Sequence, residues 1–152
     1  MSELPKRERL HHQPPEWVCD DALYFLTVCC AKRGENQLNQ VAPFETMTQA
    51  IKYYEATGKW RMALFLAMPD HWHAMIQFPE PEYMGKVLRD WKRYVAKRAG
   101  IVWQDGFFEH RLRSRQSAEE KWLYIRLNPV RKGLTEHPDK WEFVWPPNEA
   151  AR

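Results

Sequence analysis

The sequence has no long apolar run and few cysteines. None of its apolar stretches reaches the roughly 20 residues that cross a bilayer, and residues 1–8 lack the apolar centre of a signal peptide. Cys19, Cys29 and Cys30 are odd in number and two are adjacent, which suits reduced thiols better than a disulfide framework. We therefore expect a cytoplasmic protein without a membrane partner.

The sequence also has no internal repeats and no low-complexity tracts. Its length of 152 residues predicts one domain with a hydrophobic core. Residues 1–20 are polar and contain prolines, so we expect an N-terminal arm there. The single domain is predicted to span 21–147 and to be followed by a short tail at 148–152.

Positive charge is concentrated in one part of the chain. The formal net charge is only +3, but residues 86–132 contain 13 Lys and Arg against 5 Asp and Glu, which gives this block +8. The segments on both sides of the block are slightly acidic. Such a basic block is typical of a protein that binds a polyanion, nucleic acid above all, and a solvated helix surface is the alternative.

A predicted β-strand with two histidines is the first candidate for a site. Residues 67–78 alternate in polarity with the period of a strand, and the apolar side chains share one face: Trp72, Ala74, Ile76 and Phe78. His71 and His73 point to the other face, where two imidazoles at this spacing can bind one metal ion. Two surface histidines on a half-buried strand are the alternative.

The remaining pattern predicts a mixed fold. Strands are expected at 22–31, 60–68 and from 107, and helices at 43–57 and 84–98. A capping box formed by Ser117 and Glu120 predicts a last helix from about 118, ended or kinked at Asn128-Pro129. This order favours an α+β fold of the ferredoxin-like type, an antiparallel sheet with helices on one face.

The last predicted helix carries a tyrosine and an asparagine one turn apart. Tyr124 and Asn128 fall together at the polar margin of the helix. The Tyr124 phenol is a candidate nucleophile, and the Asn128 amide oxygen is a candidate third metal ligand. A phenol with a pKa of about 10 attacks phosphate poorly unless a metal ion polarises the phosphate. A packing tyrosine is the alternative.

Three segments resemble single-tyrosine HUH transposases, and within that superfamily the REP-associated tyrosine transposases. They are the residues 68–73 (MPDHWH), 103–113 (WQDGFFEHRLR) and 124–134 (YIRLNPVRKGL), in the order and with the spacing of that family. The resemblance covers residues 22–145. Trp72 departs from the pattern, because smaller aliphatic residues are more usual between the two histidines.

The resemblance implies a ferredoxin-like (RRM-like) fold with the tyrosine helix near the C-terminus. It implies that His71, His73 and Asn128 hold a divalent ion, Mg²⁺ or Mn²⁺. It also implies that Tyr124 cleaves single-stranded DNA through a 5′-phosphotyrosine intermediate, and that the strand is rejoined when this step reverses.

The DNA partners of the family are REP elements, short palindromes that fold into hairpins, so we expect single-stranded or hairpin DNA as the partner. The resemblance favours a monomer, with a homodimer as the alternative. We expect the DNA contacts to come from the basic block: Arg93, Lys97, Arg98, Arg111, Arg113, Arg126, Arg131 and Lys132.

Two other functions remain open from the sequence. A non-catalytic module of the same fold would use the basic block and exposed aromatic side chains to bind single-stranded nucleic acid. A metal-dependent nuclease would hydrolyse DNA with an activated water and leave Tyr124 a structural residue. Only the transposase forms a covalent protein–DNA adduct.

Overall fold

The computed structural model describes residues 14–15 and 23–148. Most of the predicted arm and Cys19 lie outside this range; the backbone carbonyls of Pro14 and Pro15 accept hydrogen bonds from Arg115. None of the described helices is long and apolar enough to cross a membrane. The elements are β1 (Leu23–Cys29), α2 (Val41–Ala56), β2 (Arg61–Met68), β3 (His71–Gln77), η3 (Pro81–Tyr83), α3 (Met84–Ala99), β4 (Phe108–Leu112), α4 (Arg115–Arg131), η4 (Pro138–Lys140) and β5 (Val144–Trp145).

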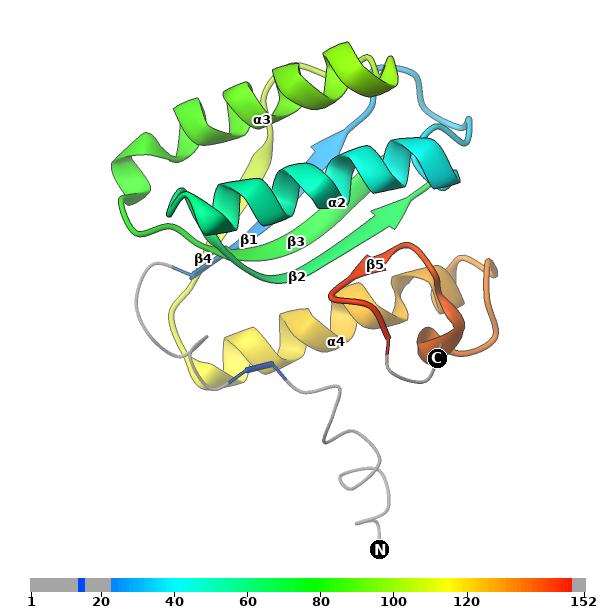
Figure 1. The fold of residues 1–152 in the computed structure, drawn as a ribbon. Coiled ribbons are helices and arrows are strands. Elements are labelled where there is room, and N and C mark those ends of the chain that lie inside the picture. Colours follow the sequence, from blue (N-terminus) through cyan, green and yellow to red (C-terminus); the bar gives the residue numbers. More distant parts are fainter. Residues whose placement is uncertain (1–13, 16–22, 149–152) are drawn as a thin grey trace, which may run out of the picture.

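The strands form one antiparallel sheet in the order β4-β1-β3-β2-β5. The first six major elements follow the order βαββαβ, with β1 and β3 at the centre (Figure 1). This is the ferredoxin-like arrangement, so the predicted α+β class is confirmed. Pro69 and Asp70 form the turn between β2 and β3, as the sequence predicts.

The two faces of the sheet differ in what they carry. Trp72, Ala74 and Ile76 of β3 lie on one face, which we call the tryptophan face, and pack into a core with α2 and α3. His71, His73 and Met75 alternate with them and lie on the other face, which we call the histidine face. The predicted division of side chains along β3 is therefore what the structure shows.

The third helix lies on the side opposite the other two (Figure 1). The prediction of helices on one face holds for α2 and α3, whereas Ala118 and Ile125 of α4 are buried against the histidine face. That face offers apolar contacts between its polar residues, including Phe25 and Met75. The apolar stripe of α4 can be buried only there, because α2 and α3 already cover the tryptophan face.

Trp72 is fully buried on the tryptophan face. Its ring centroid lies 5.0 Å from that of Phe65 and 5.3 Å from that of Trp91 in α3. Trp60 continues the cluster, 6.1 Å from Trp91. The large residue between the two histidines is thus accommodated by the α3 side of the core, and it does not crowd the histidine face.

Helix α4 is longer at both ends than the sequence predicts. Ser114, not Ser117, is the N-cap, and its hydroxyl accepts a hydrogen bond from the Ser117 backbone N–H at 3.0 Å. Pro129 neither ends nor breaks the helix, which continues to Arg131. A proline removes one backbone donor, and a buried face with favourable packing outweighs that local cost.

The two described cysteines, Cys29 and Cys30, are not in a disulfide. Cys29 is half-buried and Cys30 is buried at the end of the β1 segment. Burial raises the pKa of the Cys30 thiol to about 11, so it stays protonated at neutral pH.

Candidate functional site

The two histidines lie side by side on the histidine face, at the start of the central strand β3. Strand β3 places His71 opposite Cys29 and His73 opposite Thr27 in the neighbouring strand β1. The two imidazole centroids are 4.8 Å apart. The convergence that the two-residue spacing predicts is present in the structure.

Each imidazole is held through its Nδ1 atom. His71 Nδ1 is 2.8 Å from Oδ1 of Asp70, and His73 Nδ1 is 2.8 Å from Oγ1 of Thr27. A carboxylate can only accept, so Nδ1 of His71 donates and Nε2 keeps its lone pair. Thr27 can accept from His73 in the same way. Both Nε2 atoms are therefore the ones left for a ligand.

Burial keeps both imidazoles neutral. It lowers the pKa of His73 to about 3, and the nearby positive charges of Lys121 and Arg131 act in the same direction. Burial also lowers the pKa of His71, although the Asp70 carboxylate opposes the shift. A neutral imidazole is the form that binds a metal ion, so the pair is ready for one at neutral pH.

Helix α4 brings Tyr124 to the histidines. The centroid of its ring is 5.9 Å from that of His73 and 6.2 Å from that of Phe25. The side chain is 42% exposed, and among the described residues its hydroxyl has no hydrogen-bond partner. The phenol is thus both close to the histidine pair and open to a ligand.

Two cations flank this phenol. The Lys121 ammonium is 5.0 Å from the Tyr124 ring centroid, and the Arg131 guanidinium carbon is 4.7 Å from it. Arg131 also donates a hydrogen bond to the Tyr124 backbone carbonyl at 2.6 Å. Lys121 was not among the residues predicted from the sequence, although its position three residues before Tyr124 on a helix was the signal. Such cations can hold a phosphate beside the phenol.

Asn128 is the candidate third ligand. It is 4% exposed and faces inward, so its predicted place at a polar margin is wrong. No hydrogen bond joins its side chain to another described residue. Among the described residues no three His, Cys, Asp or Glu side chains gather as metal ligands, so these residue types supply only the two histidines here. Two imidazoles and a free amide oxygen fit a divalent ion.

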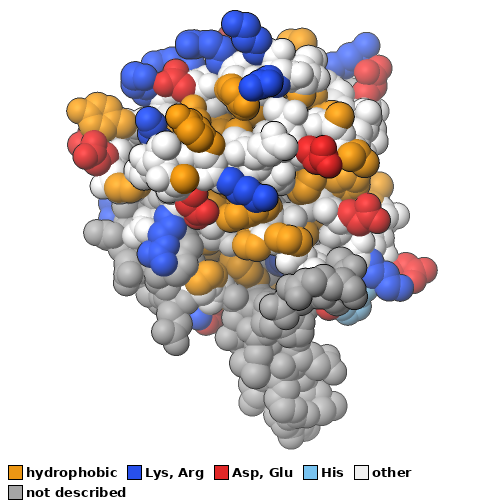
Figure 2. All heavy atoms as spheres, viewed as in Figure 1, with side chains coloured by type: hydrophobic (Ala, Val, Ile, Leu, Met, Phe, Trp, Pro, Cys, Tyr) orange, Lys and Arg blue, Asp and Glu red, His pale blue; other side chains and the backbone are white. Residues whose placement is uncertain are grey.

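The basic block of the sequence is divided in space. Arg93, Lys97 and Arg98 are exposed on α3, across the sheet from the histidines. Figure 2 shows Lys and Arg side chains gathered over this helix, at the top of the molecule. They form a surface separate from the histidine–tyrosine cluster, which no local pattern in the sequence could reveal.

Arg126 has an internal role, contrary to the prediction that it contacts DNA. It is 6% exposed, and its guanidinium pairs with the Asp139 carboxylate at 3.0 Å and with Oδ1 of Asn148. It therefore ties α4 to the C-terminal segment.

The other predicted DNA contacts are exposed. Arg111 and Arg113 lie on or just after the edge strand β4, and Lys132 lies at the end of α4. Lys132 is near enough to act on the charge state of both histidines.

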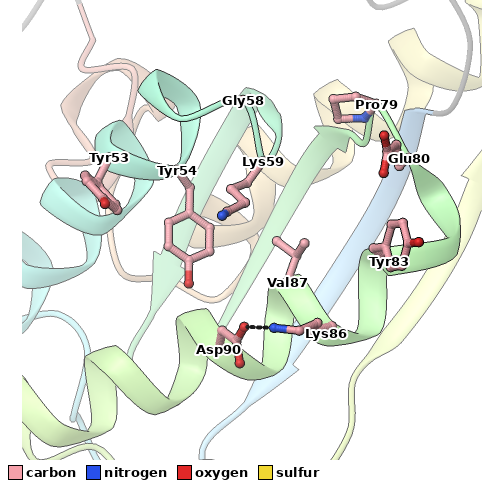
Figure 3. A pocket seen from close by; sticks show the side chains of 10 residues that line it. All are labelled: Tyr53, Tyr54, Gly58, Lys59, Pro79, Glu80, Tyr83, Lys86, Val87 and Asp90. Carbon is pink, nitrogen blue, oxygen red and sulfur yellow. Dashed lines mark hydrogen bonds and ion pairs between the residues drawn. The ribbon is translucent and has the colours of Figure 1, made fainter.

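A hollow of about 430 Å³ lies elsewhere, between α2 and the start of α3 (Figure 3). Tyr53, Tyr54 and Tyr83 line it, and the Lys86 ammonium pairs there with the Asp90 carboxylate at 2.8 Å. Its lysines are balanced by carboxylates, and it contains none of the predicted site residues.

The chain has relatives by sequence, although no model of a known protein family matches it. A REP-associated tyrosine transposase from Escherichia coli (strain K12) is 24% identical over 123 residues, which are 79% of this chain and 73% of the relative. A putative REP-associated tyrosine transposase from Haemophilus influenzae is 24% identical over 140 residues, 80% of this chain and 77% of the relative.

A solved structure of a REP-associated tyrosine transposase bound to a REP hairpin matches the fold with a TM-score of 0.75. The two are 24% identical, and the match covers 86% of this chain and 80% of the other. The chain is similar in sequence and in fold to REP-associated tyrosine transposases. The resemblance drawn from the three sequence segments is thus confirmed, and the REP-associated tyrosine transposase fold is the one in which Tyr124 meets the histidine pair.

Proposed function

We propose that the protein is a transposase that cleaves and rejoins single-stranded DNA through a covalent bond between Tyr124 and a 5′-phosphate. One observation carries the proposal. The exposed Tyr124 ring lies 5.9 Å from the His73 ring. Within the described part of the chain, neither the Tyr124 hydroxyl nor the Nε2 atom of either histidine has a hydrogen-bond partner. A tyrosine whose only role is packing would not require an exposed hydroxyl beside a pair of histidines.

The residues have distinct tasks in the reaction. The hydroxyl of Tyr124, a residue that is 42% exposed, gives its proton to solvent water. Its oxygen attacks the scissile phosphorus, while the bond from phosphorus to the 3′-oxygen breaks. The departing 3′-oxygen takes up a proton, which leaves a 3′-hydroxyl and a 5′-phosphotyrosine. Attack by a 3′-hydroxyl on the phosphotyrosine reverses the step and rejoins the strand. Lys121 and Arg131 hold the phosphate beside the phenol.

His71, His73 and Asn128 are the residues that would hold a divalent ion, Mg²⁺ or Mn²⁺. When bound, the ion polarises the phosphate and offsets the charge that develops during the attack. The neutral state of the two imidazoles and the buried amide of Asn128 support this role.

The proposed substrate is DNA that contains a hairpin of the REP type. A structural relative is bound to a REP hairpin, and the basic residues of this chain suit a polyanion. We propose that a monomer performs the reaction.

An adduct assay tests the function. A single-stranded oligonucleotide with a REP-type hairpin and a labelled 3′ end is incubated with the protein and Mn²⁺, then run on a denaturing protein gel. We expect a labelled band at the protein's mass plus that of the 3′ fragment, and mass spectrometry should find the fragment on Tyr124. Cleaved DNA without an adduct would indicate a hydrolytic nuclease instead. Binding without cleavage would indicate a non-catalytic module.

A further inference from the structure

The loop after β1 is hydrogen-bonded to the turn that precedes the histidines. Residues 30–39, which we call the clamp loop, lie against the turn at Pro69-Asp70. The Gln37 and Leu38 backbone N–H groups donate to the Pro69 carbonyl at 2.8 and 3.0 Å, and the Cys30 N–H donates to the Asp70 carbonyl at 2.8 Å. The backbone of the turn is thereby fixed just before β3 begins.

The clamp loop also saturates one oxygen of the Asp70 carboxylate. Oδ2 accepts from the Gly34 backbone N–H at 2.7 Å and from Arg33 Nε at 3.0 Å. Gly34 has a φ of 87°, a conformation that favours glycine, and this brings its N–H to the carboxylate. Oδ1 is left to face His71 Nδ1.

We propose that Asp70 and Thr27 are positioning residues, which fix the tautomer and the aim of His71 and His73 so that each presents an unprotonated Nε2. In this proposal both residues act through the histidines, and neither is itself a metal ligand or a DNA contact. The inference rests on the metal role of the histidines in the proposed function.

The two positioning contacts differ in strength. Asp70 is a charged acceptor whose Oδ2 atom is held by two donors. Its Oδ1 atom can only accept from His71, so it allows a single His71 tautomer. Thr27 has a hydroxyl that can also donate, and His73 is further held by its ring, which stacks on Phe25 with centroids 5.5 Å apart. Asp70 is therefore the more influential of the pair.

This geometry makes Asp70→Asn a sharp test. Gly34 and Arg33 are donors, so the amide oxygen must take the Oδ2 place and the NH₂ group must face His71. Nδ1 would then have to accept, and the proton would move to Nε2. The substitution keeps the size of the side chain and inverts the tautomer of one histidine.

The tautomers are read directly by ¹⁵N NMR of the imidazoles in the metal-free protein at pH 8. We expect His71 of the wild type to carry its proton on Nδ1, and His71 of Asp70→Asn to carry it on Nε2, with His73 unchanged. Asp90→Asn, the same change in an ion pair on α3, is the control and should leave both rings as in the wild type. An Nε2–H tautomer of His71 in the wild type would overturn the proposal without any variant.

Mn²⁺ affinity, measured by calorimetry, gives the second readout. We expect Asp70→Asn to weaken binding by about 10–100-fold, the usual effect of losing an outer partner, and Thr27→Val to weaken it less. Thr48→Val, on α2, is the control for the latter. Wild-type affinity in Asp70→Asn would refute the positioning role. A wild type with the expected tautomer that does not bind Mn²⁺ would instead refute the metal role in the proposed function.

Discussion

The two faces of the sheet are built from alternate residues of the same strands, yet the two faces have different roles. On the tryptophan face, Trp72 and its neighbours are buried beneath α2 and α3, and Arg93, Lys97 and Arg98 of α3 are exposed to solvent. On the histidine face, α4 covers a layer in which polar groups interrupt the apolar ones. Residues that stabilise and residues suited to chemistry are thus separated by a single sheet.

This division has a physical reason. A buried polar group is costly unless it is hydrogen-bonded, and His73 is satisfied by Thr27 while Tyr124 reaches solvent. The buried cluster of the tryptophan face consists mostly of aliphatic and aromatic side chains, so most of the packing free energy can come from there. The indole N–H groups of Trp72 and Trp91 are the exceptions, since both are buried without a hydrogen-bond partner among the described residues. Changes on the two faces should therefore have separable effects on stability, binding and cleavage.

The largest difference in adduct formation is expected between variants of two tyrosines, one on each side of the sheet. Tyr124→Phe removes one oxygen next to the histidines and should eliminate the covalent adduct, while the fold and DNA binding remain. Tyr94→Phe, on α3, should keep the adduct, because Tyr94 lies across the sheet with Arg98 over its ring. The denaturing-gel assay measures both, and an adduct that persists in Tyr124→Phe would contradict the assignment of the nucleophile.

Loss of a histidine comes next. His71→Ala and His73→Ala should lower metal-dependent cleavage by more than about 100-fold, because losing a ligand costs more than the 10–100-fold typical of an outer partner. Both variants should fold, with a lower melting temperature for His73→Ala, since that ring is buried and stacked on Phe25. Cleavage at the wild-type rate by either variant would rule out the metal role.

Replacing either of two arginines of the basic block should change the free energy of unfolding by different amounts. Arg126→Ala removes the buried guanidinium that pairs with the Asp139 carboxylate and should lower the free energy of unfolding by about 3 kcal/mol. Arg113→Ala changes an exposed side chain and should lower it by less than about 0.5 kcal/mol. Urea unfolding measures both values, and equal effects would show that Arg126 is not a structural residue.

The smallest effect is expected when the exposed cations of α3 are replaced, and it should be an effect on DNA binding. Replacing Arg93, Lys97 and Arg98 with Gln should weaken single-stranded DNA binding. The slope of log K against log salt should become shallower by roughly 0.7 for each phosphate that the variant no longer neutralises. At saturating DNA the rate of adduct formation should stay the same, because these side chains are across the sheet from Tyr124.

The matched control replaces three exposed lysines outside the basic block, Lys32, Lys52 and Lys59, with Gln. It removes the same charge and should change the salt slope less. An equal change in both triple variants would mean that α3 contributes only net charge and no binding surface.

Local patterns predicted much of this molecule. The period of β3 gave the two faces, and the spacing of Leu88, Trp91 and Val95 gave the buried side of α3, because each depends only on neighbouring residues. The start of α4 was misplaced by three residues, since Ser114 and Ser117 are both good caps and only the fold selects one.

Features that depend on tertiary contacts could not be predicted in this way. The sequence does not say that α4 lies on the histidine face, that Asn128 is buried, or that Arg126 finds Asp139. The link between Asp70 and the clamp loop joins residues 36 positions apart, and no periodicity records it.

The indoles beneath α3 give the protein an optical property. Trp60, Trp72 and Trp91 are buried in an apolar core, where an indole emits at a shorter wavelength than it does in water. Their fluorescence reports on whether α3 is seated on the sheet. A molecule bound at Tyr124 is separated from these three indoles by the sheet, so their contribution to the emission follows unfolding and does not depend on DNA at the opposite side.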